Sequence, residues 1–237
     1  METIVAAPPQ TRRQQVAAGA RDSLAAGLGM YPIGIAFGLL VIQAGLPWWI
    51  APALSIFGFA GSLELLMISM ITVATPLATI ALTTFLVNFR HVFYAFTFPL
   101  HVVRNPVARF YSMYALIDEA FAVTAGRPRA WTSWRLLAMQ LAFQSYWVGG
   151  GLTGVALAQL IPFRIQGLEF ALCALFITLT LDACRSRKEL PSLLLAGLSF
   201  SAAIVLVPDS ALFAGLIGFV VLLVARWALT RTREAAA

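Results

Sequence analysis

Two residues that can do chemistry stand side by side in an apolar stretch: Arg90 and His91, within "NFRHVFYAF". Apart from this pair, the chain carries no charged residue from Leu65 to Val103, a length that can cross a membrane. A guanidinium stays charged at any relevant pH, so within a membrane it needs a carboxylate or backbone carbonyls as partners. An imidazole titrates near neutral pH, so His91 can carry a coupling proton or simply donate a hydrogen bond between helices.

Three carboxylates in or near apolar segments are candidate partners: Glu64, Asp118 and Glu119. We expect Asp118 or Glu64 to pair with Arg90. The pair can be a purely structural ion pair, or Arg90 can hold a substrate carboxylate bidentately, through two of its guanidinium nitrogens. Consecutive helical residues point about 100° apart, so Asp118 and Glu119 cannot face the same partner. One is expected to pair with Arg90, and the other to face a water-filled path.

Glycines mark two places where a transmembrane helix can be interrupted. "GFAGS" (58–62) lies in the middle of an apolar segment, where each glycine costs about 1 kcal/mol relative to alanine. An unwound helix there would let Gly58, Gly61 and Ser62 present backbone amides to a carboxylate. Close packing of the helix is the alternative. "GGGLTG" (149–154) is a second candidate interruption, whereas the two GxxxG spacings that begin at Gly34 and Gly150 predict close helix packing.

The elements that position these residues are membrane helices. The chain of 237 residues is 60% hydrophobic and 11% charged, which excludes an ordinary soluble domain. We predict an all-α polytopic membrane protein with a bundle of about seven transmembrane segments, in a range of roughly six to eight, some of them interrupted or re-entrant. The expected segments are 23–43, 50–73, 77–100, 110–125, 135–160, 167–183, 190–207 and 211–228.

The charges predict the orientation of the chain. Basic residues gather before the first segment, in loops 126–131 and 185–191 and at the C-terminal end, so the positive-inside rule places both termini in the cytoplasm. We expect a polar tail over 1–20, a single transmembrane domain over 21–230 and a second tail over 231–237. Arg104 and Arg109 face outward if 50–73 crosses the membrane. If 50–73 re-enters, then 110–125 must re-enter as well.

Several classes of ligand are not expected. The net charge of +6 is spread between apolar segments, so we predict no nucleic-acid binding. Cys173 and Cys184 lie in one apolar segment without a CxxC spacing or a nearby histidine, so we predict neither a metal site nor a cofactor. There is no GxxxxGK[ST] motif, which favours a proton gradient over ATP hydrolysis as the energy source.

Five stretches in order, "RDSLAAGLGMYPIGIAFG", "FAGSLELL", "NFRHVFYAF", "IDEAFAVTA" and "SYWVGG", resemble the AzlC family over residues 20–230. The resemblance implies the large subunit of a branched-chain amino-acid exporter in the bacterial inner membrane, working with a small AzlD-type membrane subunit, and it allows a homo-oligomer. Glu64 is a departure, because the family often has a neutral residue such as Gln there. A second departure is Ile117, where the family has Thr.

We therefore expect a transporter of hydrophobic amino acids rather than an enzyme. Arg90 and the amides of "GFAGS" are expected to bind the substrate carboxylate. Asn88 and Phe93 are expected to contribute to the site, with Phe57, Phe59 and Phe96 around the apolar side chain. His91, Glu64, Asp118 and Glu119 are expected to pair charges or carry the coupling proton. The alternatives are an accessory subunit of another transporter, a passive channel, or an intramembrane hydrolase with Ser62 as nucleophile and His91 as base.

Overall fold

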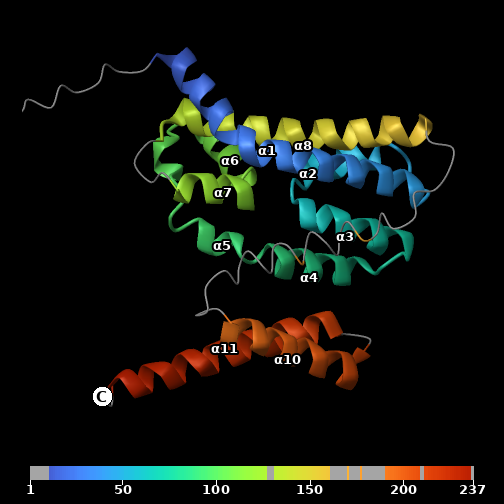
Figure 1. Ribbon diagram of the computed structural model, residues 1–237, viewed down its shortest axis with the longest axis vertical. Coiled ribbons are helices and arrows are strands. Elements are labelled where there is room, and N and C mark those ends of the chain that lie inside the picture. Colours follow the sequence, from blue (N-terminus) through green and yellow to red (C-terminus); the bar gives the residue numbers. More distant parts are fainter. Residues whose placement is uncertain are drawn as a thin grey trace, which may run out of the picture. The chain divides into compact units, whose positions relative to one another are not determined.

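The computed structural model describes residues 11–126, 131–160, 190–208 and 211–235, together with Phe170 and Ile177 (Figure 1). In these ranges the regular structure is helical. The chain divides into two compact units, Met1–Ala171 and Leu172–Ala237. The first contains α1 Arg12–Gln43, α2 Ile50–Phe57, α3 Gly61–Thr72, α4 Leu77–Asn88, α5 His91–Tyr94, a 3-10 turn Leu100–Val102, α6 Pro106–Tyr114, α7 Asp118–Ala125 and α8 Ser133–Leu160. The second contains α10 Leu190–Leu206 and α11 Ala211–Ala235.

The core of the first unit is the pair α1 and α8, which lie side by side (Figure 1). Their glycines face each other. A Cβ built on Gly34 would lie 3.2 Å from the Cα of Gly150, and one on Gly154 would lie 3.0 Å from the Cα of Gly38. The two GxxxG spacings therefore form one close contact between the helices, which confirms the prediction of packing. In lipid the hydrophobic effect does not pull helices together, so close van der Waals contact between their backbones holds them instead.

The two helices run parallel. At their first turns Arg12 lies over the ring of Trp134 at 3.6 Å, and Arg135 in the first turn of α8 pairs with Asp22, further along α1, at 2.6 Å. Gly38 and Gly154 meet further along both helices. The first turns of α1 and α8 therefore lie at the same end of the first unit.

Three predicted segments are interrupted. The segment 50–73 breaks between α2 and α3, as "GFAGS" predicts. The segment 77–100 is irregular at residues 89–90 between α4 and α5, where the backbone stays in the right-handed helical region, and 110–125 breaks at residues 115–117 between α6 and α7. The expected break in "GGGLTG" is wrong, because residues 149–154 lie within the continuous helix α8, where the glycines serve the contact with α1. The predicted segment 167–183, with both cysteines, lies outside the described residues apart from Phe170 and Ile177.

Much of the first unit's surface is apolar. Phe85, Phe89, Phe93 and Phe96 on and after α4 and α5 are all exposed, and contiguous apolar surface of this kind is rare on soluble monomers. Within the described residues, Arg12–Gln43 and Leu77–Tyr94 are long and apolar enough to cross a membrane. These surfaces fit a helical membrane protein.

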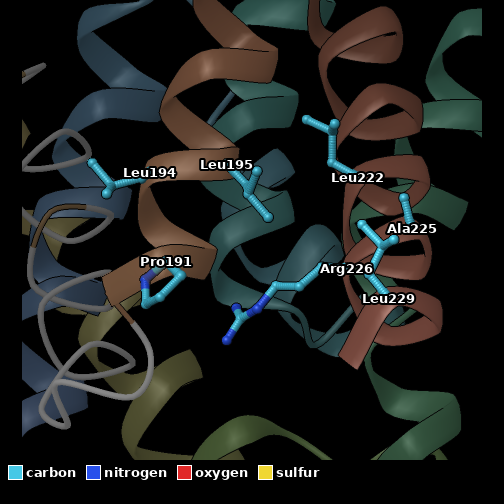
Figure 2. Close-up of a pocket in the computed structure, with 7 residues that line it drawn as sticks. All are labelled: Pro191, Leu194, Leu195, Leu222, Ala225, Arg226 and Leu229. Atoms are coloured by element: carbon cyan, nitrogen blue, oxygen red, sulfur yellow. The ribbon is translucent and has the colours of Figure 1, made fainter. Parts of the chain in front are cut away.

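The second unit is a helical hairpin. Ser199 on α10 donates a hydrogen bond of 2.8 Å to the carbonyl oxygen of Gly215 on α11. A groove of about 530 Å³ lies between the two helices and is lined by Pro191, Leu194, Leu195, Leu222, Ala225, Arg226 and Leu229 (Figure 2). Arg226 Nη1 donates to Ser192 Oγ at 2.8 Å. The described lining is aliphatic apart from Arg226.

Candidate functional site

Arg90 and Asp118 form a two-pronged ion pair. Arg90 Nε donates to Asp118 Oδ1 at 2.9 Å, and Arg90 Nη2 lies 2.8 Å from Asp118 Oδ2. This fork is the strong, directional geometry of guanidinium with carboxylate. The side chains remain 37% and 31% exposed, so the pair is reachable from outside the bundle. Of the two carboxylates predicted as partners of Arg90, Asp118 holds the position.

The pair lies where the three interrupted segments meet. Arg90 occupies the break between α4 and α5, and Asp118 is the first residue of α7. Arg90 Nη2 also donates to Oγ of Ser62, the second residue of α3, at 3.4 Å. The first amides of a helix have no partner within it and carry partial positive charge. The N-termini of α3 and α7 thus converge on one exposed guanidinium–carboxylate pair.

Aromatic rings support the pair from α5. Tyr94 donates its hydroxyl hydrogen to Asp118 Oδ1 at 2.8 Å, while its ring stacks on Phe121 with centroids 4.1 Å apart. The ring of His91 meets Tyr94 edge-on at 5.3 Å, and its Nδ1 lies 2.8 Å from the carbonyl oxygen of Asn88. Tyr94 therefore holds the carboxylate directly, and His91 touches the site through Tyr94.

Glu64 lies apart from Arg90. Its side chain is 1% exposed and accepts three hydrogen bonds, from Ser55 Oγ at 2.7 Å, from the amide of Ala60 at 3.0 Å and from Trp147 Nε1 at 2.9 Å. The amide of Ala60 is the N-cap donor of α3. Glu64 therefore holds the break between α2 and α3 against α8, with donors around both of its oxygens.

The break itself differs in detail from the glycine pattern. The left-handed residue is Phe59, with φ 42°, a strained conformation for a bulky side chain. Gly58 has ordinary φ, and its amide donates to the carbonyl oxygen of Leu54 at 2.7 Å. Gly61 is required for a different reason, because a Cβ there would lie 3.0 Å from the indole ring of Trp147. Gly61 and Ser62 thus supply the first amides of α3.

The remaining predicted residues lie around the pair or face away from it. The Oδ1 of Asn88 is buried without a hydrogen-bond partner among the described residues, the state of an acceptor that a ligand can satisfy. Glu119 follows Asp118 on α7 and is half-buried, with no ion pair to Arg90. Phe93 is 62% exposed and packs edge-on against Phe89.

The predicted phenylalanine environment is not assembled. Phe59 is buried beside Tyr114, whereas Phe57 and Phe96 are more than 80% exposed. These rings therefore do not enclose one pocket in this chain. The structure also separates the two residues of the hydrolase alternative. Ser62 accepts from Arg90 and His91 contacts Asn88, so a Ser62–His91 hydrogen bond is not among the described contacts.

Sequence reasoning missed the polar side chains of α8. Gln140, Gln144 and Trp147 follow the spacing i, i+4, i+7, which places them on one helix face. Each forms a hydrogen bond near one of the breaks. The signal was present in the sequence, because two glutamines on one face of an apolar segment need partners in a membrane. In the described residues no group of three or more His, Cys, Asp or Glu could hold a metal ion.

The comparisons with known proteins agree on a family. Residues 25–161 match the AzlC protein family. A Helicobacter pylori protein named as an uncharacterized membrane protein is 31% identical over 159 residues, which cover 65% of this chain and 69% of that protein. The branched-chain amino acid transport protein AzlC of Bacillus subtilis is 28% identical over 178 residues, 74% and 70% of the two chains. The inner membrane protein YgaZ of Escherichia coli is 25% identical over 182 residues, 73% and 74%. No solved structure matches this chain.

Proposed function

We propose that this chain, which belongs to the AzlC family, is a transporter subunit that exports branched-chain or other hydrophobic amino acids across the bacterial inner membrane. Membership supports a role in membrane amino-acid transport, since the relative from Bacillus subtilis is named for branched-chain amino acid transport. We further propose that transport runs outward, that the chain lies in the inner membrane and that both of its termini lie in the cytoplasm. An AzlD-type subunit would be its partner.

The observation that carries the proposal is the exposed Arg90–Asp118 fork. An amino acid in water carries one carboxylate and one ammonium group, and this pair offers one counter-charge to each. Binding a zwitterion between Arg90 and Asp118 keeps the site neutral, so it adds no uncompensated charge within the membrane.

The geometry suggests how the substrate would bind. The substrate carboxylate would replace Asp118 on Arg90, and the amides of Gly61 and Ser62 at the start of α3 would stabilise the same negative charge. Asp118, still held by Tyr94, would then accept the ammonium group. The roles of Gly58, Asn88 and Phe93 in contacting substrate stay predictions.

Proton coupling is the second part of the proposal. Re-formation of the Arg90–Asp118 pair would restore the empty site after the substrate leaves. Export against a concentration gradient also needs an energy source, so we propose a group beside the pair that gains and loses a proton in each cycle. His91 touches Tyr94, and Glu119 follows Asp118 on α7, so both are near enough to sense substrate. Glu64, enclosed by three donors, is a weaker candidate for this role.

Counterflow in proteoliposomes tests the function. Radiolabelled leucine, valine, methionine and a basic amino acid are offered to the purified chain, with and without an AzlD-type partner. We expect uptake of the apolar substrates and its loss in Arg90→Ala. Arg109→Ala is the matched control, because Arg109 is an exposed arginine on α6. Equal uptake by Arg90→Ala and the wild type would remove Arg90 from the site. No uptake by the wild type with its partner would refute the substrate class.

A further inference from the structure

Three side chains on one face of α8 reach two of the helix breaks that border the site, the one between α2 and α3 and the one between α6 and α7. Gln140, Gln144 and Trp147 are spaced i, i+4, i+7, and we call them the α8 stripe. Gln140 is fully buried and Trp147 is 3% exposed. Their hydrogen bonds extend to different broken segments, so one continuous helix contacts the backbone or capping groups of several short ones.

Gln140 caps the break before Asp118. Its Nε2 donates to the carbonyl oxygens of Ser112 at 2.8 Å and Ala115 at 3.0 Å, while its Oε1 has no partner among the described residues. These carbonyls lie at the end of α6, and the last carbonyls of a helix find no N–H donor within the helix. In a membrane an unsatisfied carbonyl is costly, so Gln140 stabilises the ending of α6 three residues before α7 begins.

Trp147 fixes the other break through Glu64. The indole N–H donates to Glu64 Oε2, and Glu64 Oε1 accepts from the amide of Ala60 at the start of α3. The same indole ring covers Gly61 and stacks on Phe37 of α1 with centroids 5.8 Å apart. The position of Ser62, one residue further along α3, therefore depends on α8.

Gln144 ties the two breaks together between these points. Its Nε2 donates to the hydroxyl of Tyr114 at 3.0 Å, and its Oε1 accepts from Tyr111 at 2.9 Å. The hydroxyl of Tyr114 donates in turn to the carbonyl oxygen of Ile56 near the end of α2. The end of α2 and the end of α6 are thus joined through one glutamine of α8.

We propose that the α8 stripe sets the geometry of the substrate site by holding both breaks, so that Ser62 and Asp118 stay in register on either side of Arg90. Gln140, Gln144 and Trp147, with Glu64, are positioning residues that do not touch the substrate. This inference rests on the proposed function for its effect on transport. It also predicts a change in the chain itself that can be measured without transport.

The test uses two variants of the stripe and one matched control. Gln140→Met keeps the side-chain length and removes the donor, and Trp147→Phe removes the N–H while keeping a ring against Phe37. Thr153→Val is the control, because it removes a hydrogen bond of 2.7 Å between α8 and Tyr31 of α1, away from both breaks. Each change is placed in a background with Ser62→Cys and with Cys173 and Cys184 replaced by serine, and the rate of maleimide labelling is measured. Leucine counterflow is measured for the same three changes in the unaltered chain.

We expect faster labelling of the cysteine at position 62 in both stripe variants. Trp147→Phe releases the start of α3, and Gln140→Met lets Asp118 shift together with Arg90, which contacts position 62. In counterflow, the half-saturating leucine concentration should rise about 5- to 30-fold, the ratio that one lost buried hydrogen bond produces. If the labelling rate and the half-saturating leucine concentration are unchanged in both stripe variants, the inference is overturned. It is also overturned if Thr153→Val changes them as much as the stripe variants do. If the parent chain shows no counterflow, the proposed function fails, while the labelling rates still decide the inference. Trp147→Phe alone decides it if Gln140→Met does not accumulate.

Discussion

Removing both members of the Arg90–Asp118 pair separates a substrate site from a structural ion pair. The variants are Arg90→Ala, Asp118→Ala and the double variant. A buried pair that loses one partner costs about 3–5 kcal/mol, and an exposed pair is worth at most about 1 kcal/mol. With about a third of each side chain exposed, we expect each single variant to lose roughly 1–2 kcal/mol of stability.

The double variant leaves no unpaired charge, so it should lose little more stability than either single variant. Thermal unfolding in detergent measures this part of the cycle, and leucine counterflow measures transport by the same four proteins. We expect stability to show coupling between Arg90 and Asp118, whereas transport is lost in all three variants. Transport restored to near the wild-type rate in the double variant would refute the reasoning, because the pair would then only hold the bundle together.

Three further predictions concern neighbouring contacts. Gly38→Ala should lower the melting temperature far more than Gly29→Ala, since a Cβ on Gly38 meets the backbone of α8 and one on Gly29 meets nothing within 4 Å; equal shifts would contradict the packing. Arg135→Ala removes the hydrogen bond of 2.6 Å to the buried carboxylate of Asp22, so unfolding measurements should show a loss of about 1–3 kcal/mol, and an unchanged stability would contradict this prediction. Tyr94→Phe keeps the stacked ring but removes the hydrogen bond to Asp118, which should raise the half-saturating leucine concentration about 5-fold; an unchanged value would place Tyr94 outside the site.

The sequence predicts the membrane helices and the need of Arg90 for a partner, because both depend only on residues close together in the chain. Apolar length identifies a span, and an arginine in such a span needs a partner wherever the chain goes. The break at "GFAGS" follows from glycines in a helix interior. The breaks at 89–90 and 115–117 do not, because Phe89 and the apolar residues 115–117 carry no helix-breaking signal. At 115–117 a distant residue, Gln140, satisfies the carbonyls that end α6. At 89–90 the backbone stays in the right-handed helical region, so no residue type in the sequence marks the change.

The choice between Asp118 and Glu64 also needed the fold. Both are acidic residues in apolar surroundings, so their neighbours in the sequence do not show which of them pairs with Arg90. Contacts far along the chain distinguish them, since Trp147 and Ser55 turn Glu64 inward and Tyr94 turns Asp118 toward Arg90. The same holds for "GGGLTG", whose glycines suit a break as well as a close contact. Only the presence of α1 opposite them decides for contact.

The most direct test of the central claim is competition against leucine counterflow by analogues that each lack one charge. Leucinamide keeps the ammonium group, 4-methylpentanoate keeps the carboxylate, and unlabelled leucine keeps both. If the substrate lies between Arg90 and Asp118, leucine competes strongly and either analogue competes at least tenfold more weakly. Competition by 4-methylpentanoate or leucinamide equal to that of leucine would contradict a zwitterion site at this pair.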